Sequence, residues 1–279
     1  MTDSDIQSLL TEIQQDLSLY EEKNFSHRAD IIDFLESQAA NQAQQLLTAL
    51  EEVDTRLFSR LQVRLRSEDC RRTAFIEMVG EYVDLKASHS ATAETGYDNL
   101  DLFLHRLLPS APMPEPTHQL EPGMVEYYKT PARLAFEWTD QLEFGQQDVF
   151  VDLGSGLGQI TIIVNLLTGT PSIGIEIEPA FCTYAAECAA ALNLREVSFI
   201  HTDARHADYS GGTIFFLFTP FKGAILQKVL SLLRKQAEQR PIRLIAYGPC
   251  ITELHKHSWL KPILTQSPPC SWIAFESVS

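Results

Sequence analysis

The sequence has no long apolar run. No window of eighteen consecutive apolar residues occurs in its 279 residues, and a membrane-spanning helix needs such a run. The first residues, Met1 to Asp5, also lack the basic and apolar segments of a signal peptide. We therefore expect a chain that neither crosses a membrane nor is secreted, with the cytoplasm as its compartment.

Cysteine is scarce, and no two cysteines are spaced as a Cys-x-x-Cys pair. The five are Cys70, Cys182, Cys188, Cys250 and Cys270. An odd number without close pairs predicts reduced, mostly buried thiols. Structural zinc sites usually bring their ligands in close pairs, so zinc binding by a cysteine with His255 or His257 is not favoured and we expect no metal.

Basic residues are few as well, because 22 lysines and arginines face 37 acids and give a net charge of −15. Most of the excess of acids lies in the first part of the chain, because residues 1–120 hold 21 acids against 10 bases. Such a chain repels polyanions at long range. A protein or a small molecule is therefore favoured over nucleic acid as its partner.

The first part of the chain shows apolar residues at helical spacing. Segments with this pattern cover about residues 6–20, 28–53, 57–65, 75–85 and 100–108. They predict an N-terminal all-helical domain over residues 1–108, in which Ser88 to Gly96 would be a mobile hinge. It carries no catalytic constellation, and it could cover a substrate mouth, form a dimer interface or recruit a protein. The oligomeric state stays open.

Proline then interrupts the helical pattern. Five of the fourteen prolines lie in fourteen residues, namely Pro109, Pro112, Pro114, Pro116 and Pro122. Such a segment is semi-extended and cannot be helical. We interpret residues 109–122 as a linker and residues 123–279 as a second domain.

The second domain is organised around the stretch from Val149 to Pro179, whose pattern is strand, glycine turn, helix, strand and acid. Such a crossover unit places a ligand at the carboxyl ends of its strands. Three alternate glycines follow Asp152 and let a ligand lie on the main chain. Glu176 lies about twenty residues further on, where a carboxylate can accept ribose hydroxyls. An acid in the turn disfavours phosphate and favours a ligand with an ammonium group.

Asp-Leu-Gly-Ser-Gly-Leu-Gly and Gly-Ile-Glu-Ile-Glu-Pro resemble the nucleoside-binding core of class I S-adenosylmethionine-dependent methyltransferases, over roughly residues 121–279. The resemblance implies an α/β fold: a Rossmann-like sheet of central parallel strands with a closing antiparallel strand, following the N-terminal helices. It also implies S-adenosyl-L-methionine as cofactor. The alternative is a glycine turn that only packs a helix on a strand.

The resemblance assigns cofactor contacts to individual residues. Asp203 would accept the adenine amino group and the Ala204 amide would donate to a ring nitrogen. Tyr128 and Thr130, with Thr130 as cap of a helix from Pro131 to about Leu142, would close over the methionine end. The alternatives are a turn aspartate and an ordinary helix cap with packed tyrosines. The full set of expected cofactor residues is Tyr128, Thr130, Asp152, Gly154, Ser155, Gly156, Gly158, Gln159, Glu176, Asp203 and Ala204.

The fourth apolar strand, from Thr213 to Phe218, ends in the loop that would lie beside the transferable methyl group. The resemblance implies that Thr219 contacts the nucleophile and that Phe221 excludes water, so Thr219, Phe221 and Tyr128 are the candidate catalytic residues. Tyr247, at the end of the fifth strand, could contact substrate or simply pack.

The pattern is similar to the non-SET histone lysine methyltransferases, named for disruption of telomeric silencing, in four stretches. These are the tyrosine-bearing lid segment before Pro131, the glycine turn, the Gly-x-Glu strand end and the phenylalanine-rich fourth strand. Their fourth-strand loop holds an asparagine pair, whereas this chain has Leu217, Phe218 and Thr219. Methyltransferases of base amines or glutamine carry Asn/Asp-Pro-Pro-Phe/Tyr there. We expect transfer to an amine or hydroxyl, of which a protein side chain is one candidate. The alternative is a catalytically silent cofactor-binding regulator or scaffold.

Overall fold

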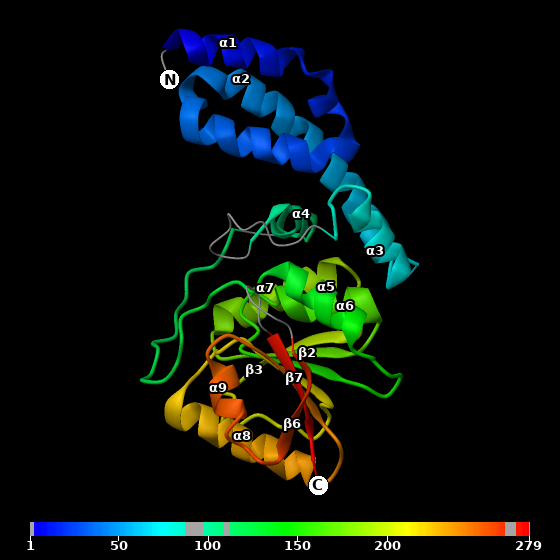
Figure 1. Ribbon diagram of the computed structural model, residues 1–279, viewed down its shortest axis with the longest axis vertical. Helices are drawn as coiled ribbons and strands as arrows, with labels where there is room; N and C mark the ends of the chain where they lie inside the picture. The colour runs from blue at the N-terminus through cyan, green and yellow to red at the C-terminus, as the bar shows by residue number, and fades with distance from the viewer. Residues whose placement is uncertain (1–2, 68, 87–96, 109–111, 266–271, 279) are drawn as a thin grey trace. The chain divides into compact units, whose positions relative to one another are not determined.

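A computed structural model describes residues 3–67, 69–86, 97–108, 112–265 and 272–278 (Figure 1). The chain divides into two compact units, Met1–Ala93 with Tyr97–Leu108 and Glu94–Gly96 with Pro109–Ser279. We call them the helical unit and the sheet unit. The expected hinge lies outside the described residues.

The described helices and cysteines agree with a chain that lacks apolar runs and paired thiols. From α1 to α9, no described helix combines the length and the apolar character needed to cross a membrane. Four of the five cysteines are described, and each is buried and forms no disulfide: Cys70, Cys182, Cys188 and Cys250. Cys270 lies outside the described residues.

The helical unit contains only helical elements among its described residues. These are α1 (Asp3–Gln15), the short 3-10 helices η1 (Leu17–Tyr20) and η2 (Glu22–Asn24), α2 (Phe25–Leu65), α3 (Thr73–Gly80) and α4 (Asn99–Leu107). Helix α4 begins with a capping box, in which the Asp98 side chain accepts from the Leu100 amide at 2.8 Å. The all-helical character predicted for this part of the chain is confirmed.

Helix α2 reverses direction within its length. Arg28 Nε donates to Asp54 Oδ1 at 2.7 Å, whereas a straight α-helix would separate positions 26 residues apart by about 39 Å. The Phe25 and Phe58 ring centroids are 5.5 Å apart. Both contacts require the two halves to pack against each other, with the reversal near their midpoint. The break expected between residues 53 and 57 is therefore wrong.

The core of this hairpin lies between α1, η1 and both halves of α2. It consists of Leu10, Ile13, Leu19, Ile32, Leu35, Ala43, Leu46, Leu47 and Leu50. Burying one leucine side chain stabilises a fold by about 1.5 to 3 kcal/mol. Apolar burial of this kind is what lets a chain with so many acidic residues close into a compact unit.

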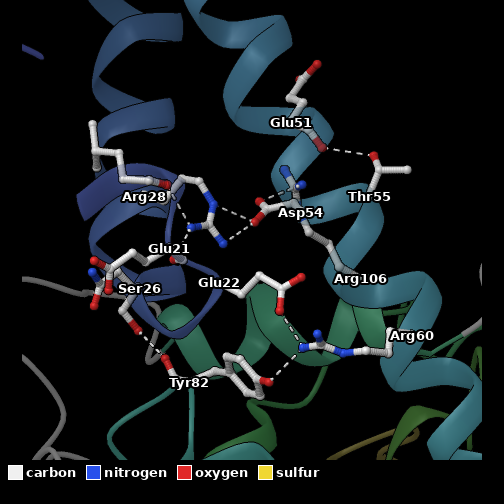
Figure 2. A network of polar contacts seen from close by, with 12 residues as sticks. Glu21, Glu22, Ser26, Arg28, Glu51, Asp54, Thr55, Arg60, Tyr82 and Arg106 are labelled. Carbon is white, nitrogen blue, oxygen red and sulfur yellow. Dashed lines mark hydrogen bonds and ion pairs between the residues drawn. The ribbon is translucent and has the colours of Figure 1, made fainter. Parts of the chain in front are cut away.

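A buried ionic network joins the same elements (Figure 2). Arg28 is fully buried, and its Nη1 donates to the carbonyl oxygens of Leu19 and Glu21 at 2.9 and 3.0 Å. Asp54, also buried, accepts from Arg28 on one oxygen and from Arg106 Nη1 of α4 on the other, at 3.0 Å. The network therefore ties η1 and both halves of α2 to α4. Arg28 Nη2 makes no hydrogen bond among the described residues, but it lies 2.6 Å from Asp54 Oδ1 as an ion pair.

The sheet unit is built on a seven-stranded sheet in the order β3-β2-β1-β4-β5-β7-β6. Its strands are β1 (Phe150–Leu153), β2 (Ser172–Glu176), β3 (Val197–His201), β4 (Ile214–Leu217), β5 (Arg243–Tyr247), β6 (Leu260–Thr265) and β7 (Trp272–Ser277). Strands β1 to β5 pair in parallel, and β7 pairs antiparallel with β5 and β6. The predicted Rossmann-like sheet with a closing antiparallel strand is confirmed.

Helices cover both faces of this sheet (Figure 1). Helices α5 (Ala132–Gln141), α6 (Gln159–Thr168) and α7 (Pro179–Ala191) lie on one face, and α8 (Gly223–Ala237) and α9 (Cys250–Leu254) lie on the other. The buried Trp138 ring of α5 packs 4.6 Å from Phe216 of β4. Strands β2 and β4 flank β1 on opposite sides, so the connections that follow β1 and β4 diverge. A crevice therefore opens at the carboxyl ends of these two strands.

Two local expectations are corrected. Pro131 is the N-cap residue of α5 and no side chain caps that helix, so the cap predicted at Thr130 is wrong. Strand β6 was not expected at all. It is an edge strand that contains Pro262 and an irregularity between Pro262 and Leu264, and proline within an apolar run masks the strand pattern in the sequence.

Candidate active site

A cavity of about 600 Å³ lies at the carboxyl ends of the parallel strands. Its size falls in the range of small-molecule sites. Eleven of the expected site residues line it: Tyr128, Thr130, Asp152, Gly154, Ser155, Gln159, Glu176, Asp203, Ala204, Thr219 and Phe221. Gly156 and Gly158 are not among the lining residues.

The glycine turn supports the cavity mainly through packing. Gly154, Gly156 and Gly158 all have positive φ angles, of 80°, 53° and 76°, which glycine adopts without strain. A Cβ at Gly156 would collide with the Tyr127 ring, and one at Gly158 would collide with the Phe199 ring. Of the three glycines only Gly154 lines the cavity, so the turn's other open faces hold aromatic side chains of the protein.

Glu176 ends β2 with its carboxylate held by three backbone amides. Oε2 accepts from the Gly156 amide at 2.7 Å, and Oε1 accepts from the Ile177 and Glu178 amides, both at 2.8 Å. The residue is 8% exposed and lines the cavity. Because the three amides fix the carboxylate while lone pairs remain, it is preorganised to accept hydrogen bonds from a ligand.

Asp152 is the last residue but one of β1, near Glu176, and is 3% exposed. Thr161 Oγ1 donates to its Oδ2 at 3.0 Å. Burial raises the pKa of Asp152 to about 7, the Thr161 hydrogen bond opposes that rise, and the charge of Glu176 adds to it. A cationic group placed near Asp152 would favour its ionised form, so the base of the cavity suits a ligand that carries positive charge.

Asp203 follows β3, and Arg205 binds its carboxylate. Arg205 donates from Nε to both oxygens, at 3.1 and 2.9 Å, and its backbone amide donates to Oδ1 at 2.7 Å. The hydrogen bonds from the Arg205 side chain lower the pKa of Asp203. Asp203 is therefore an ionised and oriented acceptor at the wall of the cavity, beside the lining residue Ala204.

Tyr127 is a site residue that sequence reasoning missed in favour of its neighbour. Its ring covers Gly156 and packs 5.4 Å from Phe181, and burial, followed by the charge of Asp152, raises its pKa. Tyr128 is 59% exposed, and its ring lies 6.4 Å from that of Phe218. Adjacent positions of an extended segment point in opposite directions, and the pair Tyr-Tyr gives no signal as to which one points inward.

Thr219 lies after β4 in a left-handed backbone conformation, with φ of 42°. A β-branched residue is strained there, and such strain is found at functional sites. Its hydroxyl donates to the Tyr247 carbonyl at 3.3 Å and accepts from the Cys250 amide at 3.1 Å. Thr219 therefore fastens the loop after β4 to the end of β5 and the start of α9.

The same loop is paired with the segment that precedes α5. Met124 and Phe221 form an antiparallel bridge, and the Val125 amide donates to the Pro220 carbonyl at 3.1 Å. Phe221 is buried, with 6% exposure. Phe218 stacks beside Tyr247 with ring centroids 4.7 Å apart. This end of the cavity is thus apolar and aromatic, which excludes water from a reacting group.

Polar side-chain atoms at the cavity show that a ligand fits it. Ser155 Oγ, Gln159 Nε2 and His118 Nε2 are buried without a hydrogen-bond partner among the described residues, and all three residues line the cavity. Buried polar groups are nearly always hydrogen-bonded. A ligand with several polar atoms would satisfy them.

No metal site is found in the described part of the chain, because no three His, Cys, Asp or Glu side chains converge there as ligands. His255 packs against Phe275, with ring centroids 5.1 Å apart, and His257 lies 6.3 Å from Trp259. Both histidines are therefore engaged with aromatic rings.

Residues 124–211 match the family model described as histone methylation protein DOT1. The match covers the glycine turn, Glu176 and Asp203, but not the loop with Thr219 and Phe221, which also lines the cavity. This similarity to DOT1 spans less than half of the chain. The sheet unit has the fold of an S-adenosylmethionine-dependent methyltransferase, and S-adenosylmethionine is its cofactor.

Solved methyltransferase structures are similar to the sheet unit. An RNA methyltransferase from Salinibacter ruber in complex with S-adenosyl-L-homocysteine is 24% identical over 54% of this chain and 92% of that chain, with a TM-score of 0.44. A ribosomal protein L11 methylase from Lactobacillus delbrueckii subsp. bulgaricus is 18% identical over 57% and 83%, with a TM-score of 0.40. None of the curated proteins compared matches the sequence. The fold assignment rests on the strand order given above.

Proposed function

We propose that this methyltransferase transfers a methyl group to an amine or hydroxyl, with the side chain of a basic protein as acceptor. The observation that supports this most is the set of three carboxylates, Asp152, Glu176 and Asp203, at the ends of neighbouring parallel strands around one cavity. The family description names histone methylation. An acidic chain with a net charge of −15 attracts a basic protein and repels nucleic acid.

The residues have distinct proposed roles toward the cofactor. Glu176 accepts the ribose hydroxyls, Asp203 accepts the adenine amino group beside the Ala204 amide, and Asp152 balances the charge of the ammonium group. Tyr128 and Thr130 border the methionine end. Ser155, Gln159 and the glycines of the turn complete the wall.

The cofactor supplies an already activated methyl group on a sulfonium. The protein therefore needs chiefly to align the acceptor and to exclude water. Phe218 and Phe221 provide an apolar surround at that end, and Thr219 holds their loop in place through Tyr247 and Cys250. We propose Thr219 and Phe221, with Tyr128, as the residues that border the acceptor.

A catalytically silent cofactor-binding protein is the second candidate. It is favoured by the Thr219 hydroxyl, which is already bonded to the Tyr247 carbonyl and the Cys250 amide. The loop 219–223 also has no amide or carboxylate side chain that could orient an amine. Retention of the fold and cofactor site without transfer would suit a regulator or scaffold.

Incubation with radiolabelled S-adenosylmethionine and a fractionated lysate separates the two candidates. We expect label to enter protein fractions, and much less label to enter with Glu176→Gln. Label in nucleic acid or in small molecules would contradict a protein acceptor. Tight S-adenosylhomocysteine binding without any transfer would support the silent protein.

Three further expectations belong to the same proposal. Residues 1–108 form a domain of their own, residues 109–122 lead into the methyltransferase domain of residues 123–279, and the protein acts in the cytoplasm. The helical domain is free to cover the acceptor, to dimerise or to recruit a partner.

A further inference from the structure

The proline-rich segment is fastened to the sheet unit on the cavity side. We call residues 112–125 the strap. Six residues of the strap line the cavity: Met113, Pro116, His118, Leu120, Met124 and Val125. A passive linker would have no reason to border a binding site at six positions.

The first fastening is Glu178, two residues after the end of β2. Its carboxylate accepts from the Thr117 amide at 2.7 Å, the Thr117 hydroxyl at 2.9 Å and the His118 amide at 2.6 Å. It also caps α7 through the Ala180 amide at 3.0 Å. Glu178 is 4% exposed, and buried hydrogen bonds to a carboxylate are among the stronger ones in proteins.

The second fastening is Arg205, after the end of β3. Arg205 Nη2 donates to Glu121 of the strap at 2.8 Å while its Nε binds Asp203. Glu121, Arg205 and Asp203 therefore form one continuous ionic chain from the strap to the wall of the cavity. A third attachment follows, because the Lys222 amide donates to the Gly123 carbonyl at 2.8 Å.

The positions of the fastenings determine what the strap covers. Strands β2 and β3 are neighbours, and neighbouring strands lie about 4.8 Å apart. The stretch from His118 to Glu121 runs from the end of one strand to the end of the other, and about 10 Å of extended chain is enough to span it. Glu176 and Asp203 lie at these same two strand ends.

We propose that the strap encloses the adenosine part of the cofactor, that Glu178 and Arg205 are positioning residues that hold it closed, and that His118 contacts the nucleoside. The inference rests on the proposed function, because Glu176 and Asp203 must hold the ribose and adenine. His118 lines the cavity, and its Nε2 is buried without a hydrogen-bond partner among the described residues. A nucleoside in the cavity supplies that partner. Release of the product then requires the strap to detach.

The test compares dissociation of S-adenosylhomocysteine from single variants of the full chain. Glu178→Gln places an amide NH₂ against the strap amides, and we expect dissociation to be about tenfold faster. Glu121→Gln breaks only a half-exposed ion pair, for which we expect about threefold. Glu115→Gln is the matched control, because Glu115 is an exposed glutamate of the strap that lies outside the cavity lining. Unchanged rates in both test variants would overturn the proposal.

Two further measurements exclude a merely structural role. In the strap variants, dissociation of free adenosine should be accelerated by the same factors as dissociation of S-adenosylhomocysteine. Faster dissociation of S-adenosylhomocysteine alone would contradict enclosure of the nucleoside. Hydrogen exchange of the Thr117 and His118 amides should slow on ligand binding in the wild type and not in Glu178→Gln. His118→Phe, which keeps a planar ring, should weaken adenosine binding about threefold to tenfold, and unchanged binding would remove His118 from the site.

The outcome separates this inference from the proposed function. If the wild-type chain fails to bind S-adenosylhomocysteine, the proposed function fails. If the wild type binds and the strap variants release the ligand at the wild-type rate, only the strap proposal fails.

Discussion

Both units bury charged side chains, but the surroundings of those charges differ. In the helical unit, Arg28 and Asp54 face each other and backbone carbonyls, so the partners shown in Figure 2 come from the protein itself. In the sheet unit, Asp152 and Glu176 are also buried, with 3% and 8% exposure, and they line a cavity at which three polar side-chain atoms lack a protein partner among the described residues. A buried charge that the fold itself neutralises has a structural role, whereas one that borders a cavity is available to a ligand.

The largest effect is expected on stability, when the buried ion pair of the helical unit loses one partner. Arg28→Met leaves Asp54 buried with only Arg106 as ionic partner, and loss of one member of a buried pair costs about 3 to 5 kcal/mol. We expect denaturant unfolding of the helical unit to shift by that amount. Arg56→Met, at an exposed position of the same helix, should change stability by less than about 0.5 kcal/mol. A loss below about 1 kcal/mol for Arg28→Met would contradict a structural role.

The corresponding change in the sheet unit should act on binding. Glu176→Gln keeps the shape but turns an NH₂ toward backbone amides or the ligand, and one charged hydrogen bond contributes about 1.5 to 3 kcal/mol. We expect affinity for S-adenosylhomocysteine to fall about tenfold to hundredfold in calorimetry. The control is Glu196→Gln, an exposed glutamate before β3. Equal affinities of the two variants would remove Glu176 from the cofactor site.

The raised pKa of Asp152 predicts a pH dependence of stability and of ligand binding in the sheet unit. A carboxyl whose pKa is raised to about 7 holds its proton in the folded protein at a pH where the unfolded chain, near 3.8, has lost it. Stability from Asp152 is therefore greatest at low pH and declines as the pH rises from 3.8 through 7, and then levels off. A ligand with an ammonium group favours the ionised form of Asp152. The affinity for that ligand should therefore rise as the pH increases toward about 7, by up to tenfold for each pH unit.

Calorimetry between pH 6 and 8 checks this dependence. Asp152→Asn should bind S-adenosylhomocysteine more weakly at pH 8 and with little dependence on pH. If the wild type binds equally well at pH 6 and 8, the carboxylate does not interact with the ammonium group of the ligand.

The smallest effect concerns Thr219. Thr219→Val removes the hydrogen bonds to Tyr247 and Cys250 but keeps the β-branched shape, and we expect methyl transfer to slow about threefold with cofactor affinity unchanged. Thr219→Ser should retain the wild-type rate because it keeps the hydroxyl. Loss of cofactor affinity in Thr219→Val would place this residue in the cofactor site instead.

Strands β1 and β2 could be predicted because each is an apolar run followed by an acid, at Phe150 to Asp152 and at Ile173 to Glu176. Such local patterns also placed the carboxylates at one edge. The reversal within α2 could not be predicted, because both halves carry the same helical periodicity and only the contact between Arg28 and Asp54 reveals the fold-back.

The features of the site that the sequence did not predict depend on tertiary contacts. The proline pattern predicted an extended segment, but its role as a cavity wall comes from Glu178 and Arg205, which lie more than fifty residues away in the sequence. Whether Tyr127 or Tyr128 points inward depends on packing against Gly156 and Phe181. The engagement of Thr219 likewise depends on Tyr247 and Cys250 of a later strand and helix.

Calorimetric titration of the full-length chain with S-adenosylhomocysteine at pH 8 tests most directly whether the cavity at the carboxyl ends of β1, β2 and β3 holds the cofactor. We predict one site per chain, with NAD⁺ giving no heat and no competition. Absence of S-adenosylhomocysteine binding, or displacement of the ligand by NAD⁺, would contradict the assignment.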